Sequence, residues 1–271
     1  MRTLLAFLEP TRLKLLFLAE WALYLLFALA RGDLRTPRQF LVGAAPFAFY
    51  YLVGCTLVAL SRRMRPIVGG GRLLACALVP VLLDQGAKAL VAATMPLGAS
   101  IPLLPGWLEL THAGNPAGSW LLGIYHVRTG VVIRLLQWSM TAFLLVLSVV
   151  SYRYYSATHR GSFWADVAFI GVFSAALSWP LDVGLRGYTL DFIGLPGHFA
   201  ADLKDITLGI GAMAIFAEGL DNPGLDHGWP GWRGHLEQSW SLVRDVTRFG
   251  WEDLRRRVRG AGPVDDHGSV S

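Results

Sequence analysis

The sequence is poor in charged residues and in cysteine. Asp, Glu, Lys and Arg make up 16% of its 271 residues, whereas soluble domains carry about 25%. Hydrophobic residues make up 54% of the chain and gather in long runs. This composition excludes an ordinary soluble domain and indicates an integral membrane protein. The formal net charge of +5 is modest, and in a membrane protein basic residues indicate topology rather than binding to nucleic acid.

The positions of the two cysteines and of His112 argue against a disulfide framework and against a metal site. Cys55 and Cys76 both lie inside apolar runs, where cysteine acts as a small buried apolar residue, so no disulfide framework is expected. His112 has no partner at metal-ligand spacing. We therefore expect no metal and no cofactor.

Membrane-spanning helices are predicted in six places. A span needs about 20 mostly apolar residues, and the candidates are 13–30, 40–60, 73–94, 131–152, 164–181 and 205–220. Arg62, Arg63, Arg65 and Arg72 lie between the second and third runs, so the positive-inside rule places this loop and both termini in the cytoplasm. The loops 95–130 and 182–204 then lie on the outer face. Three arginines of the first outer loop oppose the rule, namely Arg31, Arg35 and Arg38.

The two ends of the chain differ from the central spans. Glu20 interrupts the first apolar run, and an acid at that depth is either functional or paired with a neighbouring helix. Residues 221–234 are rich in turn formers, and 260–271 have the composition of a disordered end. Between them, apolar residues recur near helical spacing with arginines between, which suits a helix on an anionic membrane surface or one packed on a partner. The apolar residues are Leu236, Trp240, Val243, Trp251, Leu254 and Val258.

Polar residues interrupt the later apolar runs at positions that could belong to a catalytic or binding site. Asp84 and Lys88 are four residues apart in the third run, so they share a helix face and can pair, for function or for structure alone. Asn115 and Pro116 with neighbouring glycines predict a turn before the fourth run.

Asp182 and Asp205 are predicted to lie at the same outer end of neighbouring antiparallel spans. Two carboxylates brought close together can share one proton, so that one acts as a base on water while the other polarises a carbonyl. That is aspartic-protease chemistry. An acid at a helix end is also favourable without any catalytic role.

Four segments together resemble the signal peptidase II family, the lipoprotein signal peptidases. "DQGAKAL" resembles the family's D-Q-x-x-K segment, and "THAGNPAGSW" ends a stretch similar to its extracytoplasmic segment. "DVGLRGYTLDFI" resembles D-R-x-x-x-G-x-V-x-D-F-I, and "DLKDITLGIGAMAIFAEG" resembles the F-N-x-A-D segment and the last span. The resemblance covers about residues 73–220. It implies an all-α polytopic membrane protein with a four-helix core, a small extracytoplasmic β-rich segment and two added N-terminal transmembrane helices.

The resemblance also implies an activity and a set of site residues. It makes Asp182 and Asp205 the catalytic pair, with Asp202 as a rival for the second position. Asp205 is preferred, because it keeps the following span in register without a gap. The expected substrate-binding residues are Asn115, Asp84, Lys88 and Asp191.

The implied enzyme is a monomer of the bacterial inner membrane that contacts membrane lipids. It cuts diacylglyceryl-modified prolipoproteins just before the lipid-bearing cysteine. Residues 1–72 are then an added N-terminal unit, 73–220 the core, and 221–271 a cytoplasmic tail.

Several positions depart from the family pattern. Trp179 replaces an asparagine, Val183 an arginine, Gly114 an arginine, and Asp202 an asparagine three residues before Asp205. These losses leave the acids with less polar support. They keep open the hypothesis that the protein is a homologue that binds lipidated peptides, or an inhibitor of the peptidase, without cleavage. A transporter or scaffold that uses Asp84 as a proton site is a third hypothesis.

Overall fold

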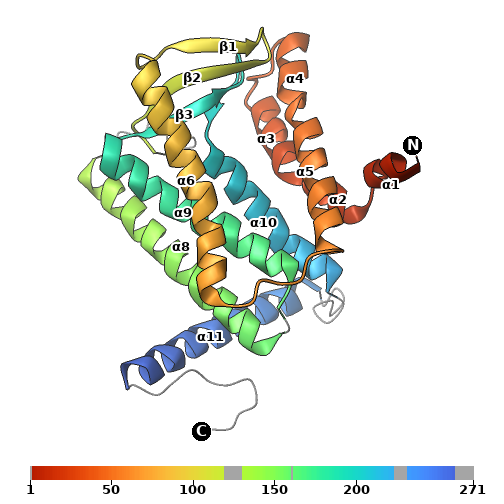
Figure 1. Ribbon diagram of the computed structural model, residues 1–271, viewed down its shortest axis with the longest axis vertical. Helices are drawn as coiled ribbons and strands as arrows, with labels where there is room; N and C mark the ends of the chain where they lie inside the picture. The colour runs from red at the N-terminus through yellow and green to blue at the C-terminus, as the bar shows by residue number, and fades with distance from the viewer. Residues whose placement is uncertain (1, 119–129, 160, 223–230, 260–271) are drawn as a thin grey trace.

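The computed structural model describes residues 2–118, 130–159, 161–222 and 231–259. The predictions for the linker residues 223–230 and for the tail 260–271 lie outside the described residues. So do Ser119 and Trp120, the end of the segment "THAGNPAGSW". Figure 1 shows a helical molecule with a small sheet at one end. The basic loop between α5 and α6 lies at the opposite end.

The added N-terminal unit consists of short helices that together make two spans. The first expected span is broken into α2 and α3, and the second is divided at Ala45, ahead of Pro46. Proline suits the start of a helix because it lacks the amide hydrogen that would have no partner there. Thr36 and Gln39 form a capping box that starts α4. The five helices are α1 (Arg2–Leu8), α2 (Arg12–Leu16), α3 (Ala19–Ala30), α4 (Pro37–Ala44) and α5 (Pro46–Ser61).

Four long helices form the described part of the core. They are α6 (Gly70–Thr94), α8 (Val131–Thr158), α9 (Phe163–Arg186) and α10 (Leu203–Asp221). Within the described residues, five segments are long and apolar enough to cross a membrane, and they match the first five predicted spans: Arg12–Ala30, Pro37–Ser61, Gly70–Thr94, Val131–Thr158 and Phe163–Arg186. The sixth expected span forms as α10, but it is not among these five. Its 19 residues include charged side chains at both ends, which shorten its apolar part.

The helices α9 and α10 approach each other closely at two glycines. A Cβ atom on Gly171 would lie 2.5 Å from the Thr207 carbonyl oxygen and 2.6 Å from Gly211 Cα. A Cβ on Gly211 would lie 2.8 Å from the Val172 nitrogen. Small residues permit such close packing of membrane helices. The contact fixes the two helices whose outer ends carry the predicted acids.

A four-stranded antiparallel sheet covers the outer end of the core. Its order is β1-β2-β3-β4, with β1 (Ser100–Leu104), β2 (Leu108–Asn115), β3 (Thr189–Gly194) and β4 (Ala200–Ala201). Strand β3 follows α9 directly, and β4 leads into α10 (Figure 1). The sheet confirms the expected β-rich segment, and it connects the ends of the helices that form the site.

The C-terminal helix α11 (Gly231–Val258) packs on α8. It begins inside the segment 221–234 that was expected to be a linker, so that prediction is wrong for residues 231–234. An ion pair of 2.6 Å joins Arg153 of α8 to Asp253 of α11. Trp240, Trp251 and Leu254 are exposed, so the apolar face predicted for this helix faces away from the described core.

Candidate active site

The ammonium group of Lys88 lies at the centre of a buried polar cluster. Its Nζ atom is 2.7 Å from Asp84 Oδ2, 2.6 Å from Asp182 Oδ2 and 2.6 Å from Asp202 Oδ2. All four side chains are at most 1% exposed. One cation therefore joins carboxylates from three helices, α6, α9 and the start of α10.

Helix α6 supplies Asp84, Gln85 and Lys88 to this cluster. Asp84 and Lys88 are one helical turn apart and pair as the sequence predicts. Gln85 also takes part, because its Nε2 donates to Asp182 Oδ1 at 2.9 Å and to Asp84 Oδ2 at 3.3 Å. The Oδ1 atom of Asp84 is buried and has no hydrogen-bond partner among the described residues.

Helix α9 supplies Asp182 together with a second cation. The Arg186 guanidinium lies 3.2 Å from Asp182 Oδ1 and donates to Gln85 Oε1 at 2.9 Å. The sequence pattern lacks an arginine at Val183, directly after the acid. The structure shows that Arg186, one turn later, reaches the same carboxylate.

Asp202, rather than Asp205, meets Asp182 across Lys88. Asp202 is the N-cap of α10, so it precedes the helix and its carboxylate is fully buried. Asp205 lies at the third helical position, where its amide donates to Asp202 Oδ1 at 3.1 Å and its own carboxylate accepts from the Asp202 amide at 3.4 Å. The Asp205 side chain is 52% exposed. The structure thus gives Asp205 a capping role and places the rival acid in the cluster.

A second group of acids surrounds Lys204. The Lys204 ammonium contacts Asp202 Oδ2, and it lies 3.5 Å from Asp205 Oδ1. Carboxylate oxygens of Asp191, Asp202 and Asp205 lie within 4.8 Å of one another. Burial raises the pKa of the Asp191 carboxyl to about 8; Lys204 opposes the shift, whereas Asp202 and Asp205 add to it. Asp191 of β3 is therefore mostly protonated at neutral pH.

Asn115 lies at the end of β2, opposite Thr189 of β3. Among the residues that the structure describes, no hydrogen bond joins its side chain to the carboxylate cluster. The following turn is held from α9, because Trp179 Nε1 donates to the Gly118 carbonyl oxygen at 3.1 Å. Gly118 has a φ of +65°, and a Cβ there would lie 2.7 Å from Trp179 Nε1. The tryptophan that replaces the family's asparagine thus anchors the turn that follows Asn115.

The carboxylates of Asp84, Asp182 and Asp202 also have the spacing of a possible cation site, since oxygens of all three lie within 4.8 Å of one another. Lys88 Nζ contacts all three at 2.6–2.7 Å. The lysine therefore supplies the positive charge that a metal ion would bring, and the donor set suits an ammonium group.

Sequence reasoning missed three members of the site. Gln85 lies in the quoted "DQGAKAL" segment, Arg186 follows Asp182 by four residues, and Lys204 separates the two rival acids. The spacing of Arg186 and Asp182 was a usable signal, because residues four apart share a helix face. No comparable signal pointed to Lys204.

The fold and the cluster define a polytopic membrane protein whose core helices carry a buried acidic site. The family model described as signal peptidase (SPase) II matches residues 76–220, more than half of the chain. The chain belongs to this family of proteases and is a multi-pass protein of the bacterial inner membrane.

Individual relatives and solved structures are similar over the same core. A lipoprotein signal peptidase of Fusobacterium nucleatum is 23% identical over 143 residues, which cover 52% of this chain and 81% of the relative. One of Desulforapulum autotrophicum is 29% identical over 122 residues, covering 45% and 72% respectively. A solved bacterial membrane enzyme, 23% identical, covers 59% of this chain and 99% of its own, with a TM-score of 0.48.

Proposed function

We propose that the protein is an intramembrane aspartic endopeptidase that removes signal peptides from diacylglyceryl-modified prolipoproteins. Asp182 and Asp202 are its catalytic pair, and Asp202 takes the place first expected for Asp205. The observation that carries the proposal is the position of these two acids. They come from neighbouring helices, are fully buried, and each lies 2.6 Å from the same ammonium group.

In the proposed reaction, Lys88 first withdraws from between the two carboxylates. Asp84 remains its partner at 2.7 Å, so the ammonium keeps a counter-ion when substrate and water enter. With Lys88 withdrawn, the two carboxyls share one proton, because they cannot both ionise cheaply at short range. This arrangement supplies a base and an acid from one pair.

The chemical step needs only the pair and a water molecule. The ionised carboxyl removes a proton from water, and the hydroxide oxygen attacks the scissile carbonyl carbon. The protonated carboxyl donates its proton to the carbonyl oxygen. When the tetrahedral intermediate collapses, the C–N bond breaks and the proton held by the base passes to the leaving nitrogen. The products are a signal peptide with a new carboxylate and a lipoprotein with a new amino terminus.

The remaining residues of the site position the pair and the substrate. Gln85 and Arg186 hold Asp182 Oδ1 at 2.9 and 3.2 Å. Asn115, at the end of β2, is the proposed contact for the substrate backbone. Asp191 lies in the group of acids that surrounds Lys204. The core helices carry many exposed apolar side chains, which suits a substrate that arrives within the membrane.

The decisive experiment is cleavage of a lipidated reporter in a host depleted of its own lipoprotein signal peptidase. Wild type should process the reporter, whereas Asp182→Asn and Asp202→Asn should leave it uncleaved at equal expression. Asparagine is a good N-cap residue, so the Asp202→Asn variant keeps the start of α10. Asp205→Asn is the matched control and should retain activity. Cleavage by the Asp182 or Asp202 variant contradicts the proposal. If only the Asp182 and Asp205 variants are inactive, the catalytic pair is Asp182 and Asp205, as the sequence first indicated.

A second candidate function is binding of lipidated peptides, or of a peptidase inhibitor, without cleavage. One observation favours it: Asp202 contacts two ammonium groups, those of Lys88 and Lys204, which together favour its ionised form. Complementation separates the two functions. A wild-type protein that binds the lipidated reporter but never shortens it supports this second function, whereas complementation of the depleted host excludes it.

A further inference from the structure

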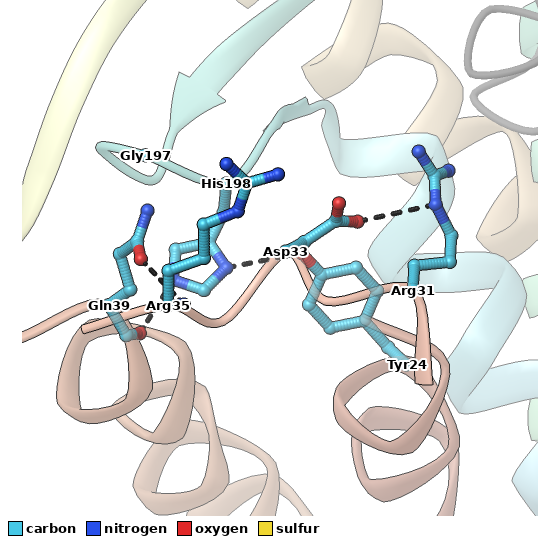
Figure 2. A pocket seen from close by; sticks show the side chains of 7 residues that line it. All are labelled: Tyr24, Arg31, Asp33, Arg35, Gln39, Gly197 and His198. Atoms are coloured by element: carbon cyan, nitrogen blue, oxygen red, sulfur yellow. Dashed lines mark hydrogen bonds and ion pairs between the residues drawn. The ribbon is translucent and has the colours of Figure 1, made fainter. Parts of the chain in front are cut away.

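The segment 31–38, which joins α3 to α4 and includes the first residues of α4, carries the three arginines that oppose the positive-inside rule. Two of them line a pocket of about 390 Å³ between the added N-terminal unit and the family core (Figure 2). One wall comes from the α3–α4 segment and includes Arg31, Asp33, Arg35 and Gln39; the other comes from the loop between β3 and β4 and includes Gly197 and His198. The pocket thus exists only because the added helices lie against the core.

Hydrogen bonds hold the two walls of the pocket together. The Tyr24 hydroxyl and His198 Nδ1 are 3.2 Å apart, and His198 Nε2 lies 2.7 Å from the Gln39 carbonyl oxygen. Both ring nitrogens of His198 are therefore used by the protein itself. The pocket is preformed, and the guanidinium groups remain as its strongest donors.

Both guanidinium groups keep free donors on the pocket side. Arg31 Nε pairs with Asp33 Oδ2 at 3.4 Å, and Arg35 Nε donates to the Gly32 carbonyl oxygen at 3.0 Å. Among the described residues, the terminal Nη atoms of both arginines have no hydrogen-bond partner. Figure 2 shows both groups projecting away from α3 and α4 on the same side. Two arginines and one aspartate leave a single net positive charge.

The pocket lies at an end of the N-terminal spans, where a bilayer places its lipid head groups. It is formed at the end of α3 and the start of α4, beside the sheet end of the molecule (Figure 1). Directly before and after it along the chain lie exposed apolar side chains, namely Leu26, Leu29, Phe40 and Leu41. A ligand with an anionic head and apolar chains matches both features, because the head reaches the arginines while the chains follow the helices.

We propose that this pocket binds a phosphate group of charge −1, as in the phosphodiester of an anionic phospholipid head group. Guanidinium groups match phosphate oxygens with paired donors, and the net charge of the pocket balances one phosphodiester. The site lies between the added unit and the core, and its lining residues include none of the carboxylate cluster. His198 in its wall lies four residues before Asp202, so an occupied pocket also stabilises the loop that carries the second acid.

The test measures the unfolding temperature of the purified full-length protein in a neutral detergent. The probes are short-chain phosphatidylglycerol, glycerophosphoglycerol (the same phosphodiester without acyl chains), inorganic phosphate, and a diacylglycerol with the same chains but no phosphate. A ligand that binds only the folded protein raises the unfolding temperature with its concentration. Phosphatidylglycerol should do so, and Arg31→Gln/Arg35→Gln should weaken its apparent Kd by about tenfold for each guanidinium removed.

Arg38→Gln is the matched control, because it removes an arginine from the same segment but not from the pocket. The Arg38 guanidinium lies against the β1–β2 turn, where a Cβ on Gly106 would be 2.2 Å from Nη2. This variant should bind phosphatidylglycerol like wild type. If the double variant does not fold, Arg35→Gln alone serves, with an expected tenfold loss.

The probes also distinguish the source of the phosphate. Tighter binding of phosphatidylglycerol than of glycerophosphoglycerol identifies a lipid head group, whereas equal binding identifies a soluble phosphate ester. An equal response to diacylglycerol overturns the proposal. So does wild-type binding by the double variant, or an equal loss in Arg38→Gln, which would indicate general attraction to positive charge.

Discussion

The Arg186 guanidinium lies 3.2 Å from Asp182 Oδ1, one turn further along α9. The resemblance expects an arginine at the position of Val183, and Arg186 is the guanidinium that contacts this carboxylate. Arg186→Gln should lower kcat/KM for the lipidated reporter by about ten- to a hundredfold, because a hydrogen bond to an ionised group contributes about 1.5–3 kcal/mol. The measurement is single-turnover cleavage, with KM expected to change less than kcat.

The matched test for Arg186 moves the arginine instead of removing it. Val183→Arg in the Arg186→Gln background restores the family's pattern and should recover part of the lost rate. Equal activity of wild type and Arg186→Gln would show that Asp182 needs no guanidinium.

The buried Lys88 is predicted to stabilise the fold as well as the site. Lys88→Met leaves the carboxylates of Asp84, Asp182 and Asp202 without their shared cation. Removing one partner of a buried ion pair costs about 3–5 kcal/mol, so the unfolding free energy in detergent should fall by that amount. Arg248→Met, which breaks an exposed ion pair of α11, is the control and should change it by less than about 0.5 kcal/mol. A Lys88→Met protein as stable as wild type contradicts the central role of this ammonium.

Asp191 is predicted to make stability depend on pH. Its pKa of about 8 in the folded protein exceeds the ordinary value near 4, so the folded state holds the proton more tightly. Stability contributed by this group is complete below about pH 4 and is lost as the pH rises through 8, at up to about 1.4 kcal/mol per pH unit. Unfolding temperatures of wild type should therefore decline from pH 5 to 8, and those of Asp191→Asn should decline less. Parallel profiles for the two proteins would contradict the assignment.

Gly43 allows the added N-terminal unit to pack on the loop before Asp202. A Cβ atom there would lie 2.7 Å from His198 Cε1 and 2.9 Å from Leu25 Cδ2. Gly43→Ala should lower stability by about 1–3 kcal/mol through overpacking, and it should slow cleavage because His198 shifts. Gly219→Ala in α10 is the control, since no atom lies within 4 Å of its Cβ; its higher helix propensity should stabilise by up to about 1 kcal/mol. Equal effects of the two substitutions would show that helix propensity alone is at work.

The helices could be predicted from sequence because their signal is local. Runs of apolar residues located the first five spans, and the pairing of Asp84 with Lys88 followed from their spacing of four. The break between α2 and α3 was missed, because the sequence around Phe17 and Leu18 is as apolar as its flanks.

The choice between Asp202 and Asp205 could not be made from sequence. Both acids lie at the start of one helix, and aligning the following span favoured Asp205. Only the cap geometry separates them, since the N-cap residue faces α6 and α9 while Asp205, three residues on, is half exposed. Likewise, the contact of Trp179 with the Gly118 carbonyl joins α9 to a distant turn, which spacing along the chain does not reveal.

The position of Asp202 has a consequence for biosynthesis. Lys88 and Asp182 are synthesised and inserted before α10, so a nascent chain holds an incomplete site until the last core helix enters the membrane. The α9–α10 pair, fixed by the glycine contact, brings Asp202 to the other two residues. In the proposed mechanism, cleavage therefore requires the complete core, and insertion of α10 is the step that completes the catalytic pair.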